Sequence, residues 1–458
     1  MTIGVLASDA APPLGAHQVQ LLLLQLGVLL LLAFCLGRLA IRCGLPAVVG
    51  ELSTGVLLGP SVLGATAPGL ADRLLPSGPE HAHLLDAVAQ FAVVMFVGVA
   101  GAQMDVGMAR RRRGVLAKVS LGSLLIPLGL GVGAGFLVPR ALMGDSAQRP
   151  VFALFLGVAL SVSAIPVIAK TLTDMRLMHR NVGQLTLASA AVSDAVGWFL
   201  LSLVSTMAVG ALTAGDAGLA LLSLAGFVAV MTFLGGPLVR AGMRRVNRTG
   251  DAGPAAATAA IVILLSAAAC QALELEAVFG AFVAGVLISS TVDQRLLAPL
   301  RTVTLAVLAP LFLATAGLRV DLTALADPAV LLAGVAVLAL ATLGKFAGAY
   351  LGARLGRLGH WEGMALGAGL NARGAVEIVV ATVGLRLGIL TTATYTIVVL
   401  IAVATSMMAP PLLRWAMNRI EQTAEEFLRE AETAPDGSDR ERRPLPGSPL
   451  VADERKTP

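Results

Sequence analysis

Long apolar stretches alternate with short polar breaks along most of the chain, and this pattern decides the fold class. Thirteen stretches have about 20 residues, the length that crosses a hydrocarbon core as a helix. They lie at 18–37, 46–65, 85–104, 115–137, 150–171, 184–209, 217–238, 254–273, 277–291, 302–319, 329–351, 363–385 and 393–413. The pattern predicts an all-α polytopic membrane protein with about 13 transmembrane helices.

The arginines give this arrangement an orientation. If the first stretch runs from outside to inside, eighteen arginines fall in inside loops. Only five fall in outside loops, namely Arg73, Arg140, Arg149, Arg319 and Arg386. Because cytoplasmic loops carry the excess of basic residues, we expect a multi-pass protein of the plasma membrane with its N-terminus outside and its C-terminus in the cytoplasm.

Composition supports the membrane assignment and changes the expected domain count. Charged residues make up only 13% of the 458 residues and the mean hydropathy is +0.84, whereas a soluble protein has roughly 25% charged residues. We therefore expect an extracytoplasmic N-terminus at 1–17, a transmembrane domain at 18–419, and a short, charged, largely disordered cytoplasmic tail at 420–458, with a brief helix near 421–432. The excess basic charge belongs to loops facing a membrane surface, so the lipid bilayer is a partner and nucleic acid is not.

Two pairs of short matches indicate an internal duplication. Val49–Leu57 and Phe279–Leu287 share the pattern G-x4-G-V-L, and Phe96–Asp105 and Phe312–Asp321 share F-x3-A-G-x3-D. Each pair lies seven apolar stretches apart. Since seven is odd, the two copies are expected to cross the membrane in opposite directions, which makes them inverted repeats of the kind common in transporters.

Ionisable residues inside the apolar stretches are few, and each requires a reason, because each costs roughly 2.5 to 3.5 kcal/mol on insertion scales. Asp194 lies near the middle of 184–209 with no oppositely charged residue within a turn. It is either a neutral acid bonded to a neighbouring helix or the group that carries the function. We favour function, since a lone carboxylate is the minimal site at which H⁺ and a metal cation compete.

Three further charged residues lie in the C-terminal third. Lys345 is placed either to pair with Asp194 or to face the negative C-terminal ends of broken helices, unless it snorkels to the cytoplasmic surface. Arg373 and Glu377 are spaced i, i+4 and are expected to pair on one helix face. That pair is either a structural salt bridge or part of a gate.

Two stretches look interrupted. In 150–171, Pro166 removes a backbone donor and pushes Ile165 out of helical geometry. The breaking residues of 363–385 are Gly369, Asn371 and Gly374. These two stretches are again seven apart, and interrupted helices at matching positions indicate a binding site at the midplane, where freed backbone groups line a polar cavity.

These segments carry a family resemblance. The chain resembles the monovalent cation/proton antiporters of the second cation:proton antiporter group, and most of all the transmembrane part of plant cation/H⁺ exchangers and fungal K⁺/H⁺ antiporters. The matching stretches are GELSTGVLLGPSVLG at 50–64, ALSVSAIPVIAKTL at 159–172, AAVSDAVGW at 190–198, GKFAGAYLGARL at 344–355 and NARGAVEIVVATVGL at 371–385.

The resemblance implies a fold and a set of roles. It implies a homodimer with a scaffold domain and a core domain, in which spans 5 and 12 are discontinuous helices that cross at their unwound middles. Asp194 takes the place of the ion-carrying aspartate and Lys345 that of the basic residue on the partner helix. Electrogenic relatives carry two adjacent aspartates, whereas Ser193 stands at the first of these positions here, which suggests electroneutral exchange unless Lys345 also carries a proton.

The resulting hypothesis is a secondary antiporter that exchanges H⁺ for K⁺ or Na⁺ by alternating access at Asp194. Ser193, Asn371, Ser163 and the backbone carbonyls around Ser161 to Ile165 are the further proposed ligands, because alkali ions prefer neutral oxygens. Asp194 would hold the metal ion only transiently, and no cofactor is expected. A cation channel or membrane ion sensor on the same fold is the alternative. An intramembrane hydrolase ranks last, because Ser193 has no nearby histidine.

Overall fold

The computed structural model describes residues 15–75, 79–103, 113–145, 147–209, 214–247, 251–273, 275–289, 291 and 295–427. Regular structure in these ranges is helical, and the pairing of Met143 with Leu390 is an isolated bridge that extends into no strand. Residues 1–14 and 428–458, which make up most of the expected N-terminal segment and of the tail, lie outside the described residues.

The α-helices follow the order of the apolar stretches. Their bounds are α1 Ala16–Arg42, α2 Ala47–Leu58, α3 Pro68–Leu74, α4 Pro79–Ala102, α6 Arg113–Leu137, α7 Arg149–Ser161, α8 Ile165–Asp174, α9 Asn181–Val209, α10 Ala214–Val230, α11 Gly236–Asn247, α12 Ala252–Ala272, α13 Ala277–Ser289, α14 Ala298–Val303, α15 Ala309–Gly317, α16 Pro328–Leu355, α17 His360–Leu370, α18 Ala375–Arg386 and α19 Thr392–Met417. Short π-helical turns at 60–64, 231–235 and 304–308 adjoin α2, join α10 to α11 and join α14 to α15.

The described residues contain ten helices that are long and apolar enough to cross a membrane, or eleven if the bent pair α17 and α18 is one span. Two shorter apolar helices, α7 and α13, add to these. Each of the thirteen expected stretches falls on one of these elements. The positions of the stretches are therefore correct, whereas the count of thirteen crossings stays a prediction.

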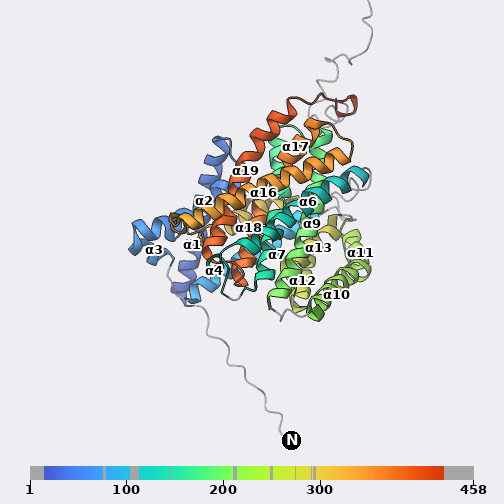
Figure 1. Ribbon diagram of the computed structural model, residues 1–458. Coiled ribbons are helices and arrows are strands. Elements are labelled where there is room, and N and C mark those ends of the chain that lie inside the picture. Colours follow the sequence, from blue (N-terminus) through green and yellow to red (C-terminus); the bar gives the residue numbers. More distant parts are fainter. Residues whose placement is uncertain are drawn as a thin grey trace, which may run out of the picture.

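The contacts between helices divide them into two bundles, and Figure 1 shows where each labelled helix lies. The most extensive contacts of the first, which we call the site bundle, join α6, α7, α9 and α16 to α19. The second, which we call the flanking bundle, contains α1 to α4 and α11 to α15, with close pairs such as α13 on α4 and α15 on α2, while α10 contacts α9 of the site bundle. α1 begins at the lower face in Figure 1 and α19 ends at the upper face, so the two ends of the described chain lie on opposite sides.

Glycines of the two repeated motifs make equivalent contacts. A Cβ on Gly50 would lie 2.1 Å from the carbonyl oxygen of Leu36 on α1, and one on Gly280 would lie 2.5 Å from that of Ser266 on α12. The second glycine of each motif meets the other half of the chain, because Gly55 lies against α15 and Gly285 against α4. These backbone contacts are closer than any side chain allows, so the motif marks the same packing site in both halves.

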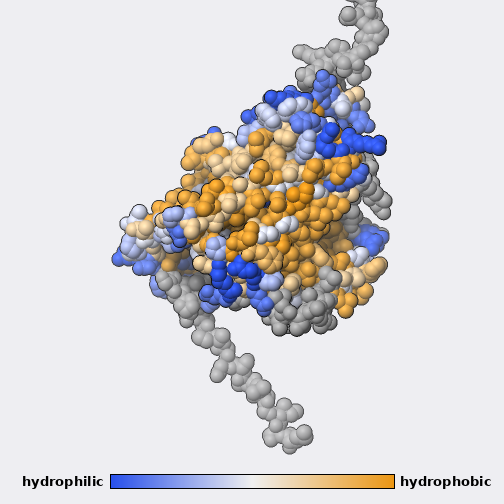
Figure 2. Space-filling view, in the orientation of Figure 1, coloured by the Kyte–Doolittle hydropathy of each residue, from blue (hydrophilic) through white to orange (hydrophobic). Residues whose placement is uncertain are grey.

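The surface agrees with a membrane protein. Figure 2 shows hydrophilic residues gathered at opposite ends of the molecule, with a broad hydrophobic band between them. Large apolar side chains are exposed on this surface, including Phe34, Leu137, Phe233, Leu332 and Leu343. A soluble protein rarely exposes so much contiguous apolar surface, so lipid is the expected solvent of this band.

The first residues after α19 dock on the start of α9. The Glu426 carboxylate accepts hydrogen bonds from the backbone N–H groups of Asn181 (2.5 Å) and Thr423 (2.8 Å) and lies 3.3 Å from the Arg180 guanidinium. Arg180 also donates to the carbonyl oxygens of Ile420 and Glu421. A short helical turn at 424–427 stands within the expected helix at 421–432, and this clamp holds the N-terminus of the helix that carries Asp194.

Removing the clamp should destabilise the protein, whereas removing the rest of the tail should not. We expect a chain that ends at Phe427 to melt like the full chain in detergent, and one that ends at Arg419 to melt at a lower temperature. Glu426→Gln should lose about 1.5–3 kcal/mol, the usual contribution of a hydrogen bond to a charged group. Equal melting temperatures for the two truncated chains would show that the clamp contributes nothing.

The clamp also has a predicted pH dependence. Burial alone would raise the pKa of Glu426, but the N–H groups of Thr423 and Asn181 and the charge of Arg180 outweigh burial and hold this pKa below its ordinary value of 4.5. A carboxyl group whose pKa is lowered by folding stabilises the folded state above its unfolded pKa and loses that contribution as the pH falls through its folded pKa. The native chain should therefore melt above Glu426→Gln by the largest margin near pH 7, and this margin should decrease below about pH 4.5.

Candidate functional site

Two helices of the site bundle are interrupted. α7 ends at Ser161, residues 162–164 are not helical, and α8 begins at Ile165. The expectation that Pro166 would push Ile165 out of helical geometry is wrong, because the break comes earlier. Proline fits the first turn of a helix, whose N–H groups have no intrahelical partner, so Pro166 can follow Ile165 as the second residue of α8.

The second interruption separates α17 from α18, which are bent by 47° relative to each other. α17 ends at Leu370, Asn371 caps it, and Gly374 precedes α18 with φ +148°, a value that favours glycine. Gly369 lies inside the last turn of α17, against Thr186 of α9. It is therefore a packing residue of the helix end and not part of the extended segment.

The two interruptions touch each other. The Ser163 hydroxyl donates to the carbonyl oxygen of Leu370 at 3.1 Å, and the N–H of Ala164 donates to that of Ala372 at 3.3 Å. The unwound segments thus satisfy part of each other's backbone. The Ser163 hydroxyl proton is therefore used in this bond, and the lone pairs of its oxygen remain available to an ion.

Two buried cations cover the C-terminal end of α7. Arg373 donates to the carbonyl oxygens of Ala159 (3.1 Å) and Leu160 (2.5 Å), and Lys345 donates to that of Ser161. Arg373 and Lys345 both have 0% exposure. The last carbonyls of a helix have no intrahelical partner and carry partial negative charge, so the two side chains replace both the missing hydrogen bonds and the missing water.

A carboxylate covers the other side of the same break. Asp194, on α9, is 3% exposed, and its Oδ2 accepts a long hydrogen bond of 3.4 Å from the N–H of Ile165, the first residue of α8. The N-terminus of a helix favours an anion. Among the described residues, Asp194 and Lys345 form no ion pair within 4 Å. Of the two expected roles of Lys345, pairing with Asp194 or facing the C-terminal end of a broken helix, the structure shows the second.

Several buried polar atoms near the interruptions have no hydrogen-bond partner among the described residues. They are Asp194 Oδ1, Ser193 Oγ, both polar atoms of the Asn371 amide, and Glu377 Oε2. Leaving a buried polar group unsatisfied costs roughly 1–3 kcal/mol. Unused oxygens on Asp194, Ser193 and Asn371 are the kind of group that an alkali ion or water would use.

Arg373 and Glu377 form a buried ion pair of 3.2 Å. The expectation that they share a helix face is wrong, because Arg373 lies in the extended segment before α18 and Glu377 in the first turn of that helix. The i, i+4 spacing nevertheless brings them together, since Glu377 stands at the positive end of α18 and Arg373 turns back toward α7.

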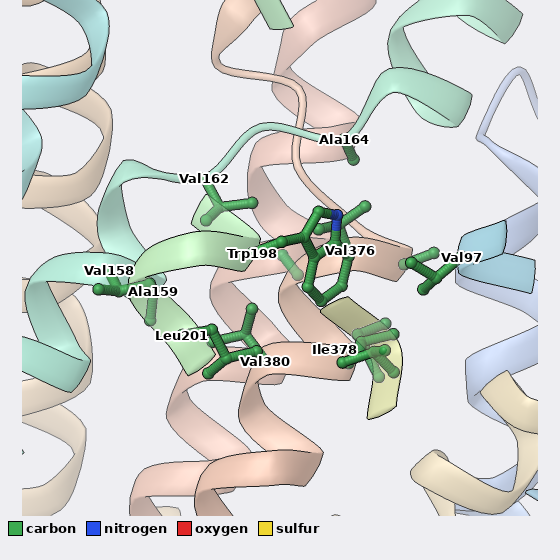
Figure 3. Packing of buried hydrophobic residues seen from close by; sticks show 14 of the residues in the cluster. Val97, Val158, Ala159, Val162, Ala164, Trp198, Leu201, Val376, Ile378 and Val380 are labelled. Carbon is green, nitrogen blue, oxygen red and sulfur yellow. The ribbon is translucent and has the colours of Figure 1, made fainter. Parts of the chain in front are cut away.

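An apolar wall surrounds the interruptions. Figure 3 shows Trp198, one turn beyond Asp194 on α9, lying beside Val376 at the start of α18, with Val162 of the first interruption close by. A Cβ on Gly197 would meet Val162 Cγ2 at 2.6 Å. The charged groups therefore lie in an apolar, tightly packed surrounding, in which electrostatic interactions are strong.

Three further ion pairs join residues far apart in the sequence, and sequence reasoning did not find them. Arg180 meets Glu426, Arg319 meets Asp86, and Arg386 meets Glu276. The sequence placed these three arginines in loops only. The sequence shows opposite charges at the ends of apolar stretches, which indicates that such ends can form ion pairs. It does not show which ends are neighbours in the fold.

A helical membrane fold with interrupted helices that meet at buried charges defines a class that includes many secondary transporters. The comparisons with known proteins are more specific. Residues 28–419 match the family model described as sodium/hydrogen exchanger, transmembrane. The chain belongs to this family.

Relatives and a solved structure agree with the family assignment. The chain is 28% identical over 400 residues to Cation/H(+) antiporter 17 of Arabidopsis thaliana, covering 87% of this chain and 48% of that protein. It is 28% identical over 401 residues to the Na(+)/H(+) antiporter NhaS4 of Synechocystis, covering 86% and 96%. The chain thus spans about half the length of the plant relative.

The fold itself resembles the sodium proton antiporter MjNhaP1 from Methanocaldococcus jannaschii. The TM-score is 0.63 at 14% sequence identity, covering 87% of this chain and 97% of that one. At this identity the likeness concerns the fold alone.

Gly374→Ala should destabilise the protein. The added Cβ would lie 2.8 Å from Val167 Cγ2, at a φ that L side chains rarely adopt, and we expect a loss of about 1–3 kcal/mol. Gly226→Ala is the matched control, because nothing lies within 4 Å of its added Cβ on α10 and alanine favours a helix. Thermal melting in detergent compares the two, and an undiminished melting temperature for Gly374→Ala would contradict the strained geometry.

Removing Arg373 should cost more than neutralising its partner. Arg373→Leu leaves the Glu377 carboxylate and the carbonyl oxygens of Ala159 and Leu160 without their donor, a loss of about 3–5 kcal/mol for a broken buried pair. Glu377→Gln keeps an oxygen that Arg373 can bond. Melting temperatures should therefore fall in the order native, Glu377→Gln, Arg373→Leu, and the reverse order would show that Arg373 is not the cap of α7.

Proposed function

We propose that this chain is a secondary antiporter that exchanges H⁺ for a monovalent cation, K⁺ or Na⁺, by alternating access at Asp194. The observation that carries the proposal is one buried carboxylate at the junction of α7 and α8, with one oxygen bonded to α8 and the other without a partner among the described residues. Membership of the sodium/hydrogen exchanger family and the names of the relatives support the same reaction class.

The charged side chains around the break differ in how they are bonded, and this difference explains why Asp194 is the proposed carrier of the proton and the cation. Lys345 and Arg373 are engaged with the carbonyl oxygens of α7, and Glu377 is engaged with Arg373. Among these four side chains, Asp194 keeps an unpartnered carboxylate oxygen and has no ion pair within 4 Å in the described part of the chain, whereas the charge of Glu377 is already balanced by Arg373. A bound proton or a bound alkali ion each neutralises that single charge, so the two cargoes exclude one another.

We propose Ser193, Asn371 and Ser163 as further ligands of the cation. Ser193 adjoins Asp194 on α9, Asn371 caps α17, and Ser163 lies between α7 and α8. Their neutral oxygens suit a dehydrated alkali ion, which prefers oxygen ligands. Moving the empty carboxylate through an apolar barrier would be costly, so only the loaded site bundle is expected to move. This requirement couples the two fluxes.

Stoichiometry and assembly complete the proposal. Because Ser193 stands where a second carboxylate would be needed, we propose one H⁺ for one cation, an electroneutral exchange in which Lys345, Arg373 and Glu377 compensate charge without carrying it. We further propose a homodimer in the plasma membrane with the N-terminus outside, as the arginine distribution indicates. The resemblance to fungal K⁺/H⁺ antiporters favours K⁺ over Na⁺.

Loss of the Asp194 charge should abolish exchange. In proteoliposomes with an imposed pH gradient, K⁺ or Na⁺ should collapse the gradient through the native protein and not through Asp194→Asn. Asp251→Asn makes the same change at an exposed helix cap whose side chain forms no capping bond, and it should leave exchange intact. Full activity of Asp194→Asn would end the proposal, and flux of the cation without proton movement would favour a channel.

Electroneutral exchange predicts insensitivity to voltage. With Na⁺ as the driving cation, the initial rate of proton movement should be the same with and without an imposed membrane potential, because no net charge crosses. Moving one charge across 100 mV corresponds to about 2.3 kcal/mol, so an electrogenic cycle would respond clearly. A rate that follows the potential would show that Lys345 or another group carries a second proton.

A further inference from the structure

Two neighbouring cavities lie at the end of the molecule where α4 begins and α15 ends. The larger, of about 410 Å³, is lined by residues of α1, α3 and α4 and by the turn after α2, among them Gln25, Asp72 and Leu85. The smaller, of about 60 Å³, lies between α4, α13, α15 and α18. Asp86, Thr315 and Arg319 line both, so the two cavities meet at these residues. We call the pair of cavities the vestibule.

The vestibule belongs to the side predicted to be extracytoplasmic, since Arg319 and Arg386 are two of the five arginines placed in outside loops. Its smaller cavity reaches α18 at Val379. Val379 follows the interruption at Gly374 by five residues, about 7.5 Å along a helix. The vestibule therefore extends from the surface to within two turns of the break in α18.

Two ion pairs divide the vestibule. Arg319 and Asp86, 2.5 Å apart, lie where the larger cavity joins the smaller one, and both belong to the flanking bundle. Arg386 and Glu276, 2.7 Å apart, line the smaller cavity. The second pair joins the bundles, because Arg386 ends α18 of the site bundle and Glu276 immediately precedes α13 of the flanking bundle.

Glu276 is attached to the site bundle twice. Its carboxylate meets Arg386 of α18, and its backbone N–H donates to the Ser202 hydroxyl of α9 at 3.3 Å. The Glu276 side chain is 8% exposed and that of Arg386 is 40% exposed. The pair thus has one buried and one partly exposed partner, so solvent can hydrate Arg386 when the two side chains separate.

We propose that the vestibule is the outer access path of the transported cation and that the Arg386–Glu276 ion pair is the latch that closes it by tying the site bundle to the flanking bundle. This inference rests on the proposed function, because a latch between bundles has a role only if they move relative to each other. Any displacement of α18 away from α13 breaks this pair and opens the smaller cavity, whereas the Arg319–Asp86 pair stays within one bundle.

The latch can be tested by the accessibility of a residue behind it. Thr382, on α18, lines the smaller cavity. Cys35, Cys43 and Cys270 are first replaced by serine, and Thr382→Cys then serves as the reporter in intact cells. A membrane-impermeant sulfonated thiol reagent added outside should modify it slowly while the latch is intact. Glu276→Gln and Arg386→Gln, made separately, should each raise the rate about two- to fivefold, the range expected for a partly exposed ion pair.

Two matched variants separate a latch from general loosening. Glu276→Arg combined with Arg386→Glu reverses the pair and should return the labelling rate to that of the unmodified latch. Glu426→Gln makes the same chemical change in an ion pair on the opposite side of the molecule and should leave the rate unchanged. Unchanged rates in both single variants, no recovery in the reversed pair, or an equal increase in Glu426→Gln would each overturn the latch.

The labelling result does not depend on transport, so the two proposals fail separately. If Asp194→Asn still exchanges ions, the proposed function falls whatever the labelling shows. If Asp194→Asn is inactive and labelling ignores the ion pair, only the latch falls. Modification of Thr382→Cys from the cytoplasmic side alone, measured in everted vesicles, would overturn the assignment of the vestibule to the outer face.

Discussion

The structure depends on how the broken helix is capped inside a membrane. The break between α7 and α8 leaves carbonyl oxygens on one side and N–H groups on the other, at buried positions where each needs a hydrogen-bond partner. Arg373 and Lys345 supply donors to the carbonyl oxygens at 159–161, and Asp194 supplies an acceptor to α8. The signs match the helix ends, with cations at the C-terminus and the anion at the N-terminus. These side chains make the interruption tolerable, and they also bring charge to the centre of the fold.

The C-terminal end of α7 is capped by more hydrogen bonds than the N-terminal end of α8. This difference supports Asp194, which caps α8, as the proposed functional group. The Lys345 ammonium and the Arg373 guanidinium are committed to α7, whereas Asp194 makes one long bond and keeps an oxygen without a partner among the described residues. A fully satisfied network would be rigid and inert. The proposed exchange of one positive ligand for another at a loosely held carboxylate needs no dismantling of the fold around it.

The sequence predicted the helices, both interruptions and the charged residues beside them, because an ionisable group in an apolar run is conspicuous. It expected Ile165 outside a helix, whereas Ile165 is the first residue of α8 and Pro166 the second, where a proline fits. It also missed Arg386–Glu276 and Arg180–Glu426, whose partners are 110 and about 246 residues apart. Such pairs depend on which helix ends meet, and helix periodicity carries no information on that.

The energies of the ion pairs indicate which contacts can change during a transport cycle. Arg373–Glu377 is fully buried, and leaving one charge of such a pair without its partner costs about 3–5 kcal/mol, so this pair is the more costly of the two to separate. Arg386–Glu276 has one partner 40% exposed, and an exposed pair contributes only about 0–1 kcal/mol. Glycine contacts such as Gly55 on α15 and Gly285 on α4 fix the flanking bundle internally. In the proposed alternating access, the contacts that cost least to change are therefore those between the two bundles at the rim, and the buried charges are expected to stay together within the site bundle.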